Sequence, residues 1–178
     1  MINSGKEWDW MDNKNNRVMD KWVIFDLDGT LALIDERRKL AEKENGKMDW
    51  DKFFDPKNIK LDKPNWPIIN TLKAFRQIIS PYKIAIFSGR NDISIKETKE
   101  WLREHGINWD ILKMRPNKHP FKFMDDRKLK LQWLNEVDWK EDVEMVFDDR
   151  QKVVDMWREV GLTCLQVAPG EWPAKNVL

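Results

Sequence analysis

Four short apolar runs are the feature that most restricts the fold of this chain. They lie at residues 22–27, 83–87, 143–147 and 162–167, and most are rich in valine, isoleucine and phenylalanine. Continuous runs of this kind are typical of strands that are buried on both faces, because a half-exposed strand alternates apolar and polar residues. The runs therefore predict a sheet that is covered on both sides.

The segments between the runs have the spacing of amphipathic helices. In one of them, four apolar residues recur at intervals of four and three on one helical face: Ile68, Leu72, Phe75 and Ile79. Similar repeats occur at residues 95–102, 129–137 and 153–160, and Gly161 is placed to end the last helix. Strands that alternate with helices predict an α/β fold, a parallel sheet flanked by helices, with its active crevice at the carboxyl ends of the strands.

Two segments do not follow this alternation. Residues 31–66 are charged and lie between the first strand and the first regular helix, which predicts a small cap insertion. Residues 1–20 have no clear period and receive no assignment, so the expected domain spans residues 21–178. A chain of 178 residues is long enough for one ordinary domain with a substantial core.

Composition excludes several classes of protein. The formal net charge is +1, whereas a dedicated duplex-binding domain is usually more basic. No apolar run approaches the roughly 20 residues of a membrane-spanning helix, and the first residues lack the apolar core of a signal peptide, so no membrane partner is expected. Cys164 is the single cysteine, which excludes a disulfide framework and is typical of the reducing cytoplasm.

Polar residues end three of the four apolar runs. The first run leads into Asp26-Leu27-Asp28-Gly29-Thr30, the second into residues 88–90 (Ser-Gly-Arg), and the third into residues 148–150 (Asp-Asp-Arg). In a parallel sheet these residues are expected to meet along one edge. Neighbouring carboxylates repel one another unless a divalent cation lies between them, and oxygen ligands favour Mg²⁺.

Such a site suits phosphoryl transfer. Asp26 is the candidate nucleophile, which would form an aspartyl-phosphate, and Asp28 is the candidate acid and base. Ser88 would hydrogen-bond the transferring phosphoryl group, and a lysine would offset its charge; Lys130 is preferred for this role, with Lys128 as the reserve. The alternative interpretation is a turn without chemistry, but the second acidic pair at another strand end argues against it.

The order of these motifs resembles the haloacid dehalogenase (HAD) superfamily of phosphotransferases. The matching stretches are DLDGT, FSGR, a motif lysine and FDDR, and the match extends from about residue 22 to residue 170. The segment VFDDRQKVVDMWREVGLTCLQVAPGEW closely resembles the phosphatase domain of phage polynucleotide kinase/phosphatase proteins, and MRP at residues 114–116 and Asp126 fit the same group. The resemblance implies a Rossmann-like sheet with a cap, which here would be the small insertion.

The resemblance also implies roles for individual residues. Asp26 would be the nucleophile and Asp28 the acid and base, while Ser88 and Lys130 would hold the phosphoryl group. The groups implied to bind Mg²⁺ are the Asp26 carboxylate, the Asp28 backbone carbonyl, Asp148 and, nearby or through water, Asp149. The further candidates for binding the substrate or its phosphate are Thr30, Gly89, Arg90 and Arg115.

The substrate implied is a 3′-phosphate at the end of a nucleic acid, which suggests nucleic-acid repair in the cytoplasm, or in the host cytoplasm if a phage encodes the protein. No Gly-x-x-x-x-Gly-Lys-Ser/Thr loop is present, so no kinase domain is expected in this chain. A nucleoside monophosphate phosphatase is the alternative, and a catalytically silent relative that binds a nucleotide or a protein is the third. A basic rim would favour a polynucleotide, and its candidate residues are Arg37, Arg38 and Lys39 in the insertion together with Arg90, Arg115 and Arg150. The sequence predicts no oligomeric state.

Overall fold

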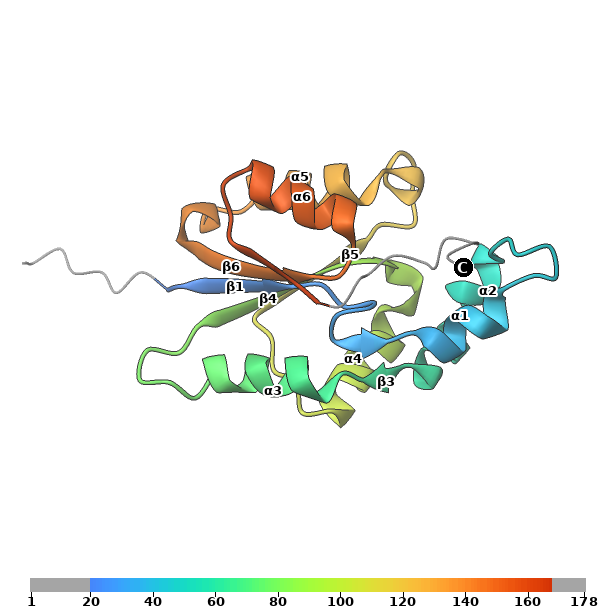
Figure 1. The fold of residues 1–178 in the computed structure, drawn as a ribbon, viewed down its shortest axis with the longest axis horizontal. Helices are drawn as coiled ribbons and strands as arrows, with labels where there is room; N and C mark the ends of the chain where they lie inside the picture. The colour runs from blue at the N-terminus through green and yellow to red at the C-terminus, as the bar shows by residue number, and fades with distance from the viewer. Residues whose placement is uncertain (1–19, 168–178) are drawn as a thin grey trace, which may run out of the picture.

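Five parallel strands form the central sheet of the computed structural model, which describes residues 20–167 (Figure 1). Their order across the sheet is β5–β4–β1–β6–β7, so β1 lies at the centre. The strands are β1 (Trp22–Phe25), β4 (Lys83–Asn91), β5 (Ile111–Arg115), β6 (Val143–Asp148) and β7 (Cys164–Gln166). The predicted parallel sheet is confirmed.

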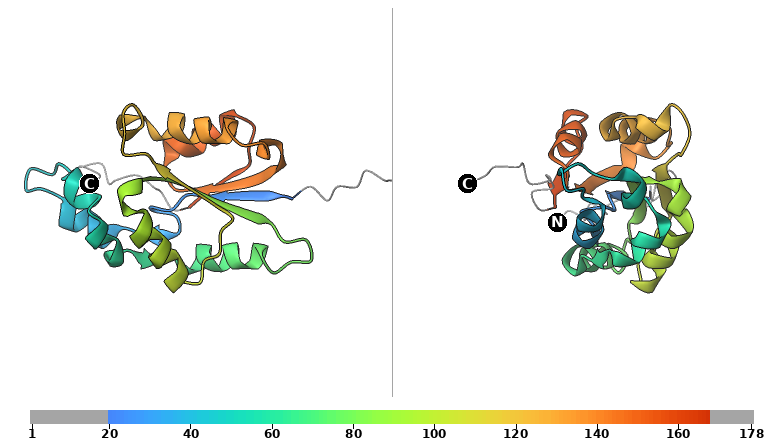
Figure 2. Two further views of the ribbon diagram at one scale, coloured as in Figure 1. Left: turned by 180° about the vertical axis from the view of Figure 1, so that it is seen from behind. Right: turned by 90° about the vertical axis from the view of Figure 1, so that its right-hand side faces the viewer.

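Helices cover both faces of the sheet, with two on each side (Figures 1 and 2). The four helices are α3 (Trp66–Phe75), α4 (Ile95–Glu104), α5 (Asp126–Asn135) and α6 (Gln151–Glu159). Shorter 3-10 helices are η2 (Asp92–Ser94), η3 (Phe121–Phe123) and η4 (Lys140–Asp142). No helix in residues 20–167 is long and apolar enough to cross a membrane.

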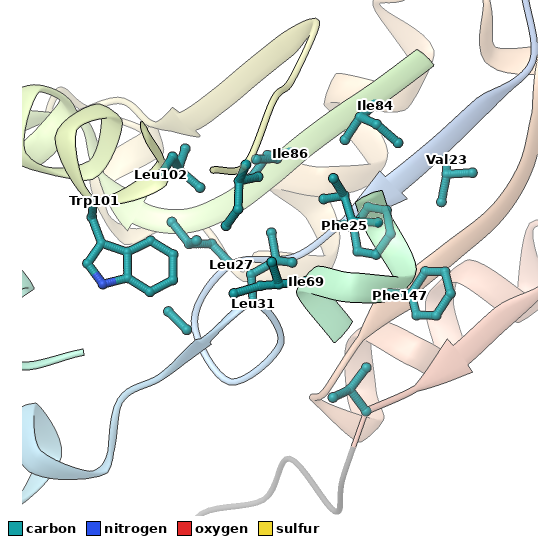
Figure 3. Packing of buried hydrophobic residues seen from close by; sticks show 14 of the residues in the cluster. Val23, Phe25, Leu27, Leu31, Ile69, Ile84, Ile86, Trp101, Leu102 and Phe147 are labelled. Atoms are coloured by element: carbon teal, nitrogen blue, oxygen red, sulfur yellow. The ribbon is translucent and has the colours of Figure 1, made fainter. Parts of the chain in front are cut away.

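The alternating sides of β1 explain why its apolar run is continuous. Val23 and Phe25 pack on the face that α3 and α4 cover, where they join Ile69 in the cluster of Figure 3. Trp22 and Ile24 pack on the opposite face, against α5 and α6. Each large side chain buried in this way contributes about 1.5–3 kcal/mol to folding. The two cores hold β1, and the residues that follow it, in a fixed position.

Two local predictions differ from the structure. The sequence did not predict β5, because Lys113 interrupts its apolar residues and the strand, which pairs with β4, is an edge strand among residues 20–167. The helical pattern that ends at Ile79 extends too far, since α3 ends at Phe75 and Ile79 is fully exposed. Gly161 does follow the last helix, as predicted, with a positive φ of 85°.

The segment between β1 and α3 forms a small folded insertion. It contains β2 (Ala32–Leu33), α1 (Asp35–Ala41), α2 (Trp50–Phe53), η1 (Pro56–Leu61) and β3 (Lys63–Pro64). Strands β2 and β3 pair in an antiparallel manner. Helices α1 and α2 lie beyond the carboxyl ends of the central strands, at the right of Figure 1. Residues 1–20 received no assignment from the sequence. Of these, Asp20 is described by the structure, and residues 1–19 lie outside the described part of the chain.

Candidate active site

Three aspartates meet at the carboxyl ends of β1 and β6. Asp26 directly follows β1, and its backbone N–H donates to the carbonyl oxygen of Phe147 at 2.8 Å. Asp148 closes β6, and Asp149 follows it. One carboxylate oxygen from each of the three aspartates lies within 4.8 Å of the others, and all three residues are buried. The sheet thus brings together acidic residues that are more than a hundred positions apart in the sequence.

Lys130 supplies positive charge to these carboxylates. Its Nζ lies 2.6 Å from Asp26 Oδ1 and 2.7 Å from Asp148 Oδ2, and the residue is buried on α5. Burial lowers the pKa of Lys130, but the carboxylates of Asp148 and Asp26 more than offset this and raise the pKa above its usual value. Lys128 is exposed on the same helix. Of the two lysines considered, the structure therefore brings Lys130 to the carboxylates.

The three carboxylates carry more negative charge than Lys130 offsets. Burial raises the pKa of Asp26 to about 7, against the opposing effect of Lys130, and raises the pKa of Asp149 to about 9. Within the described part of the chain, the buried Oδ1 of Asp149 has no hydrogen-bond partner. An excess of buried carboxylate charge and an unpaired oxygen fit a divalent cation. Because the ligand atoms are all oxygen, they fit Mg²⁺.

The loop after β1 presses Gly29 against this cluster. Its φ is +92°, a conformation that favours glycine, and a Cβ at this position would lie 2.1 Å from Asp149 Oδ2. The carbonyl oxygen of Leu27 accepts hydrogen bonds from the backbone N–H groups of residues 30–32, at 3.3, 3.0 and 2.8 Å. Both the backbone and the space beside Asp149 therefore require glycine.

The side chain of Asp28 belongs to a second, separate charge network. Arg37 donates from Nη2 to Asp28 Oδ1 at 2.7 Å, and Arg90 donates from Nε to the same oxygen at 3.1 Å. Both arginines also bind Asp62, Arg37 through Nε at 2.7 Å and Arg90 through Nη2 at 2.7 Å. Burial acts to raise the pKa of Asp28, but Arg37 and Arg90 lower it to about 2. Asp28 is therefore ionised, and its carboxylate is bound to the two arginines. The group of Asp28 that is expected to bind Mg²⁺ is its backbone carbonyl.

Arg37 and Asp62 are the residues that sequence reasoning missed. Arg37 was expected on an exposed basic rim, but its side chain is fully buried between Asp28 and Asp62, so this expectation is wrong. Arg38 does line the cavity described below, and Lys39 is exposed. Arg37 lies four residues before the buried Ala41 on α1, which is the one periodic signal for an inward-facing side chain. Asp62, just before β3, carries no signal of this kind.

The predicted phosphate-binding residues lie around the two networks. Ser88 is buried in β4, and its Oγ accepts the backbone N–H of Arg90 at 3.1 Å, an arrangement in which the hydroxyl can still donate. Gly89 lines the cavity, and a Cβ there would lie 2.8 Å from Asp126 Oδ1. The Thr30 hydroxyl is buried and, in the described part of the chain, has no hydrogen-bond partner. Phosphate binding by these residues stays a prediction.

Arg115 holds the loop that precedes α5. Its Nε donates to the carbonyl oxygen of Gly89 at 3.0 Å, and its Nη1 donates to those of Phe121 and Met124 at 2.8 and 2.6 Å. Its Nη2 forms an ion pair with Asp126. Arg115 and Arg90 both line the cavity, and their guanidinium groups are bound to protein groups. A role for either in binding phosphate also stays a prediction.

A cavity of about 1050 Å³ opens beside the carboxylates. Its wall includes Asp26, Asp28, Lys130 and Asp149 from the charge networks, together with residues of α2 and η3. The volume lies just above the range of about 300–1,000 Å³ that is usual for small-molecule sites. The cavity therefore has room for a substrate much larger than phosphate alone.

Comparison with known proteins gives matches over most of the chain. The family model of the polynucleotide kinase PNKP phosphatase domain matches residues 20–172. A chain in the structure of the Pnkp1/Rnl/Hen1 RNA repair complex is 31% identical with a TM-score of 0.68, and the match covers 94% of this chain and 48% of that chain. The present chain thus spans about half the length of that relative.

More distant structures share the fold. A haloacid dehalogenase-like family hydrolase from Streptococcus pneumoniae is 15% identical with a TM-score of 0.55, over 84% of this chain and 85% of that chain. A HAD family enzyme from Bacteroides thetaiotaomicron, in complex with magnesium and inorganic phosphate, is 15% identical with a TM-score of 0.50, over 87% and 98% of the two chains. With the family model covering residues 20–172, the chain belongs to the PNKP phosphatase-domain family of the HAD superfamily and is a phosphatase, an enzyme of the hydrolase class.

Proposed function

We propose that this protein removes 3′-phosphates from the ends of nucleic acids in a Mg²⁺-dependent reaction. The observation that carries the proposal is the buried set of Asp26, Asp148 and Asp149, with Lys130 between them, at the wall of a large cavity. The relative in an RNA repair complex supports a nucleic-acid end as the substrate. The carboxylate donor set supports Mg²⁺, which Asp26, Asp148 and Asp149 would hold.

In the first step, a carboxylate oxygen of Asp26 would attack the phosphorus. A bond forms between this oxygen and phosphorus while the bond from phosphorus to the 3′ oxygen breaks, and Asp28 gives a proton to the departing 3′ oxygen. Lys130, at 2.6 Å from Asp26, offsets the negative charge of the reacting groups. Bound Mg²⁺ would supply further neutralisation of the phosphate charge, which otherwise repels the Asp26 carboxylate.

In the second step, water would release the phosphate from Asp26. Asp28 takes a proton from the water, whose oxygen attacks phosphorus, and the bond between phosphorus and the Asp26 oxygen breaks. Arg37 and Arg90 hold Asp28 ionised, as the base step requires, but the low pKa that they give Asp28 makes it a weak base while these contacts are in place. The acid step needs a protonated Asp28 and therefore a change in its contacts with the two arginines during the cycle.

The test is phosphate release from an oligonucleotide that carries a 3′-phosphate, measured with Mg²⁺ and after its removal by a chelator. The proposal expects release with Mg²⁺ only, and loss of nearly all turnover in Asp26→Asn. Asp155→Asn is the matched control, because Asp155 is an exposed carboxylate on α6 outside the cavity wall. The same oligonucleotide with a 5′-phosphate should remain intact.

Two results would contradict the proposal. Equal turnover by the wild type and Asp26→Asn would exclude Asp26 as the nucleophile and would favour a catalytically silent relative. Absence of release from the 3′-phosphorylated oligonucleotide by the wild type, with release from free nucleotides, would exclude a polynucleotide end as the substrate.

A nucleoside monophosphate phosphatase is the second candidate, and the charge of the cavity favours it. Among the described residues, eight acidic and six basic side chains line the cavity, so the wall offers little net attraction to a polyanion. Rates on a mononucleoside 3′-phosphate and on an oligonucleotide separate the two candidates. Preference for the mononucleotide would support the nucleotidase, and preference for the oligonucleotide would support end processing.

A further inference from the structure

An aromatic pair, the exposed Trp50 and the half-buried Phe54, lies on the wall of the active-site cavity. Trp50 begins α2 and is 55% exposed, and Phe54 directly follows the helix. Their rings are stacked, with centroids 5.8 Å apart and an interplanar angle of 20°. Both residues line the cavity. We refer to Trp50 and Phe54 as the aromatic platform.

Arg37 links the aromatic platform to Asp28, the proposed acid and base, because it contacts both Asp28 and Phe53. Phe53 stands between Trp50 and Phe54 in the sequence. Its ring meets the Trp50 ring edge-on, with the ring centroids 5.7 Å apart. The Arg37 guanidinium lies 4.4 Å from the centroid of the Phe53 ring and donates to the Phe53 carbonyl oxygen at 3.2 Å. The same guanidinium binds Asp28 at 2.7 Å. The platform therefore has a fixed position relative to the reacting groups.

The charges of the cavity wall argue against recognition through the phosphate backbone. Tracking a nucleic-acid backbone requires a groove with an excess of lysine and arginine. This wall instead has more acidic than basic side chains among the described residues, and several of its arginines are bound to carboxylates. The apolar and aromatic surface of the wall is a further source of attraction beyond the reacting phosphate, and a nucleobase has a flat π-face that suits such a surface.

We propose that the aromatic platform stacks the base of the nucleotide that carries the 3′-phosphate. The inference rests on the proposed function and deepens it, because it makes base stacking the basis of substrate selection. Stacking of one base on an aromatic side chain changes affinity by about 5- to 150-fold. A substrate with a terminal base should therefore react faster than one without it by a factor in this range.

The test compares two oligonucleotides that differ only at the 3′-terminal nucleotide. Both carry the 3′-phosphate, but one has a normal base there and the other an abasic sugar. The wild type should show kcat/KM higher by about 5- to 150-fold on the first. Because stacking acts through the base alone, Trp50→Ala should remove this preference while turnover of the abasic substrate changes little.

Three further variants separate stacking from a structural role. Trp50→Phe keeps an aromatic ring and should retain part of the preference, whereas Trp50→Leu keeps apolar bulk and should lose it. Trp66→Ala is the matched control, because Trp66 is a 48% exposed tryptophan that begins α3 and does not line the cavity. It should keep the full preference. Melting temperatures measured alongside establish which variants are folded.

Three outcomes would overturn the inference. The first is equal kcat/KM of the wild type on the two substrates, with clear phosphate release from both, which leaves the proposed function intact. The second is an equal loss on both substrates in Trp50→Leu and Trp50→Ala, which indicates a structural role for Trp50. The third is the absence of release from either substrate, which removes the proposed function together with the inference.

Discussion

The replacement of Arg37 by methionine tests the buried charge network most directly. Arg37 and Arg90 together balance Asp28 and Asp62, and both arginines are fully buried. Arg37→Met leaves two buried carboxylates with one guanidinium while it preserves apolar bulk beside Phe53. Removal of one partner from a buried ion pair costs about 3–5 kcal/mol. For a domain of this size, we expect the melting temperature to fall by roughly 6–20 °C.

The loss of stability in Arg37→Met should depend on pH. Burial raises the pKa of Asp62 in the folded protein to about 6, above the ordinary aspartate value of 3.8, against the opposing effect of Arg90. The Asp62 carboxyl thus contributes favourably to the free energy of unfolding below pH 3.8, and this contribution is lost as the pH rises through about 6. Without Arg37 the pKa of Asp62 rises further, so ionisation of Asp62 costs more at neutral pH. The difference from the wild type should therefore be smaller in acid and larger above pH 6.

Denaturant unfolding of the wild type and Arg37→Met, at about pH 5 and at about pH 8, measures this difference. Lys39→Met is the control, because Lys39 is exposed on the same helix and its closest carboxylate contact is 4.0 Å long. It should change the free energy of unfolding by less than about 0.5 kcal/mol. A loss below about 1 kcal/mol in Arg37→Met, or an equal loss at both pH values, would refute the charge argument.

The remaining predictions concern the loop, the metal and the cysteine. Gly29→Ala should lose at least about 1–2 kcal/mol of stability, the cost of its left-handed φ for a residue with a Cβ, and should lose phosphatase turnover because that Cβ would also clash with Asp149; unchanged turnover and melting temperature would contradict this. Mg²⁺ at 100 times its Kd should stabilise the folded protein by about 2.7 kcal/mol, and a shift of equal size in Asp148→Asn, measured by thermal melting against a chelator, would exclude the proposed ligand set. Burial raises the pKa of the Cys164 thiol to about 12, so a thiol reagent should label the native protein far more slowly than the unfolded one; fast native labelling would show that the thiol is accessible.

The sheet and its acidic edge were predictable because their signals are local. A strand that is buried on both faces is mostly apolar: β1 is apolar throughout, and β4 and β6 each contain an apolar run that precedes the polar residues at their carboxyl ends. Once the strands are parallel, their carboxyl ends meet at one edge, which brings Asp26 to Asp148 and Asp149. The edge strand β5 was not predicted because an edge strand is less buried than a central one, and its apolar residues are interrupted by Lys113.

The partners of Asp28 were not predictable because their signals are not local. Arg37 stands beside Arg38 and Lys39, a run that is usually a solvated face, and only its tertiary contacts with Asp28 and Asp62 show that Arg37 is buried. Asp62 becomes significant only because η1 and β3 place it between two arginines from different parts of the chain. The spatial relation of Trp50 to the cavity likewise depends on how the insertion folds.

The central position of β1 has a consequence for local unfolding. Strand β1 is hydrogen-bonded to β4 on one edge and to β6 on the other, whereas β2 and β3 pair over only two residues each. Amide hydrogens of β1 should therefore exchange with solvent only through global unfolding, and those of the insertion through smaller, more frequent openings. The nucleophile would stand on the slowest-exchanging part of the protein, while the wall that receives the substrate can open without disturbing it.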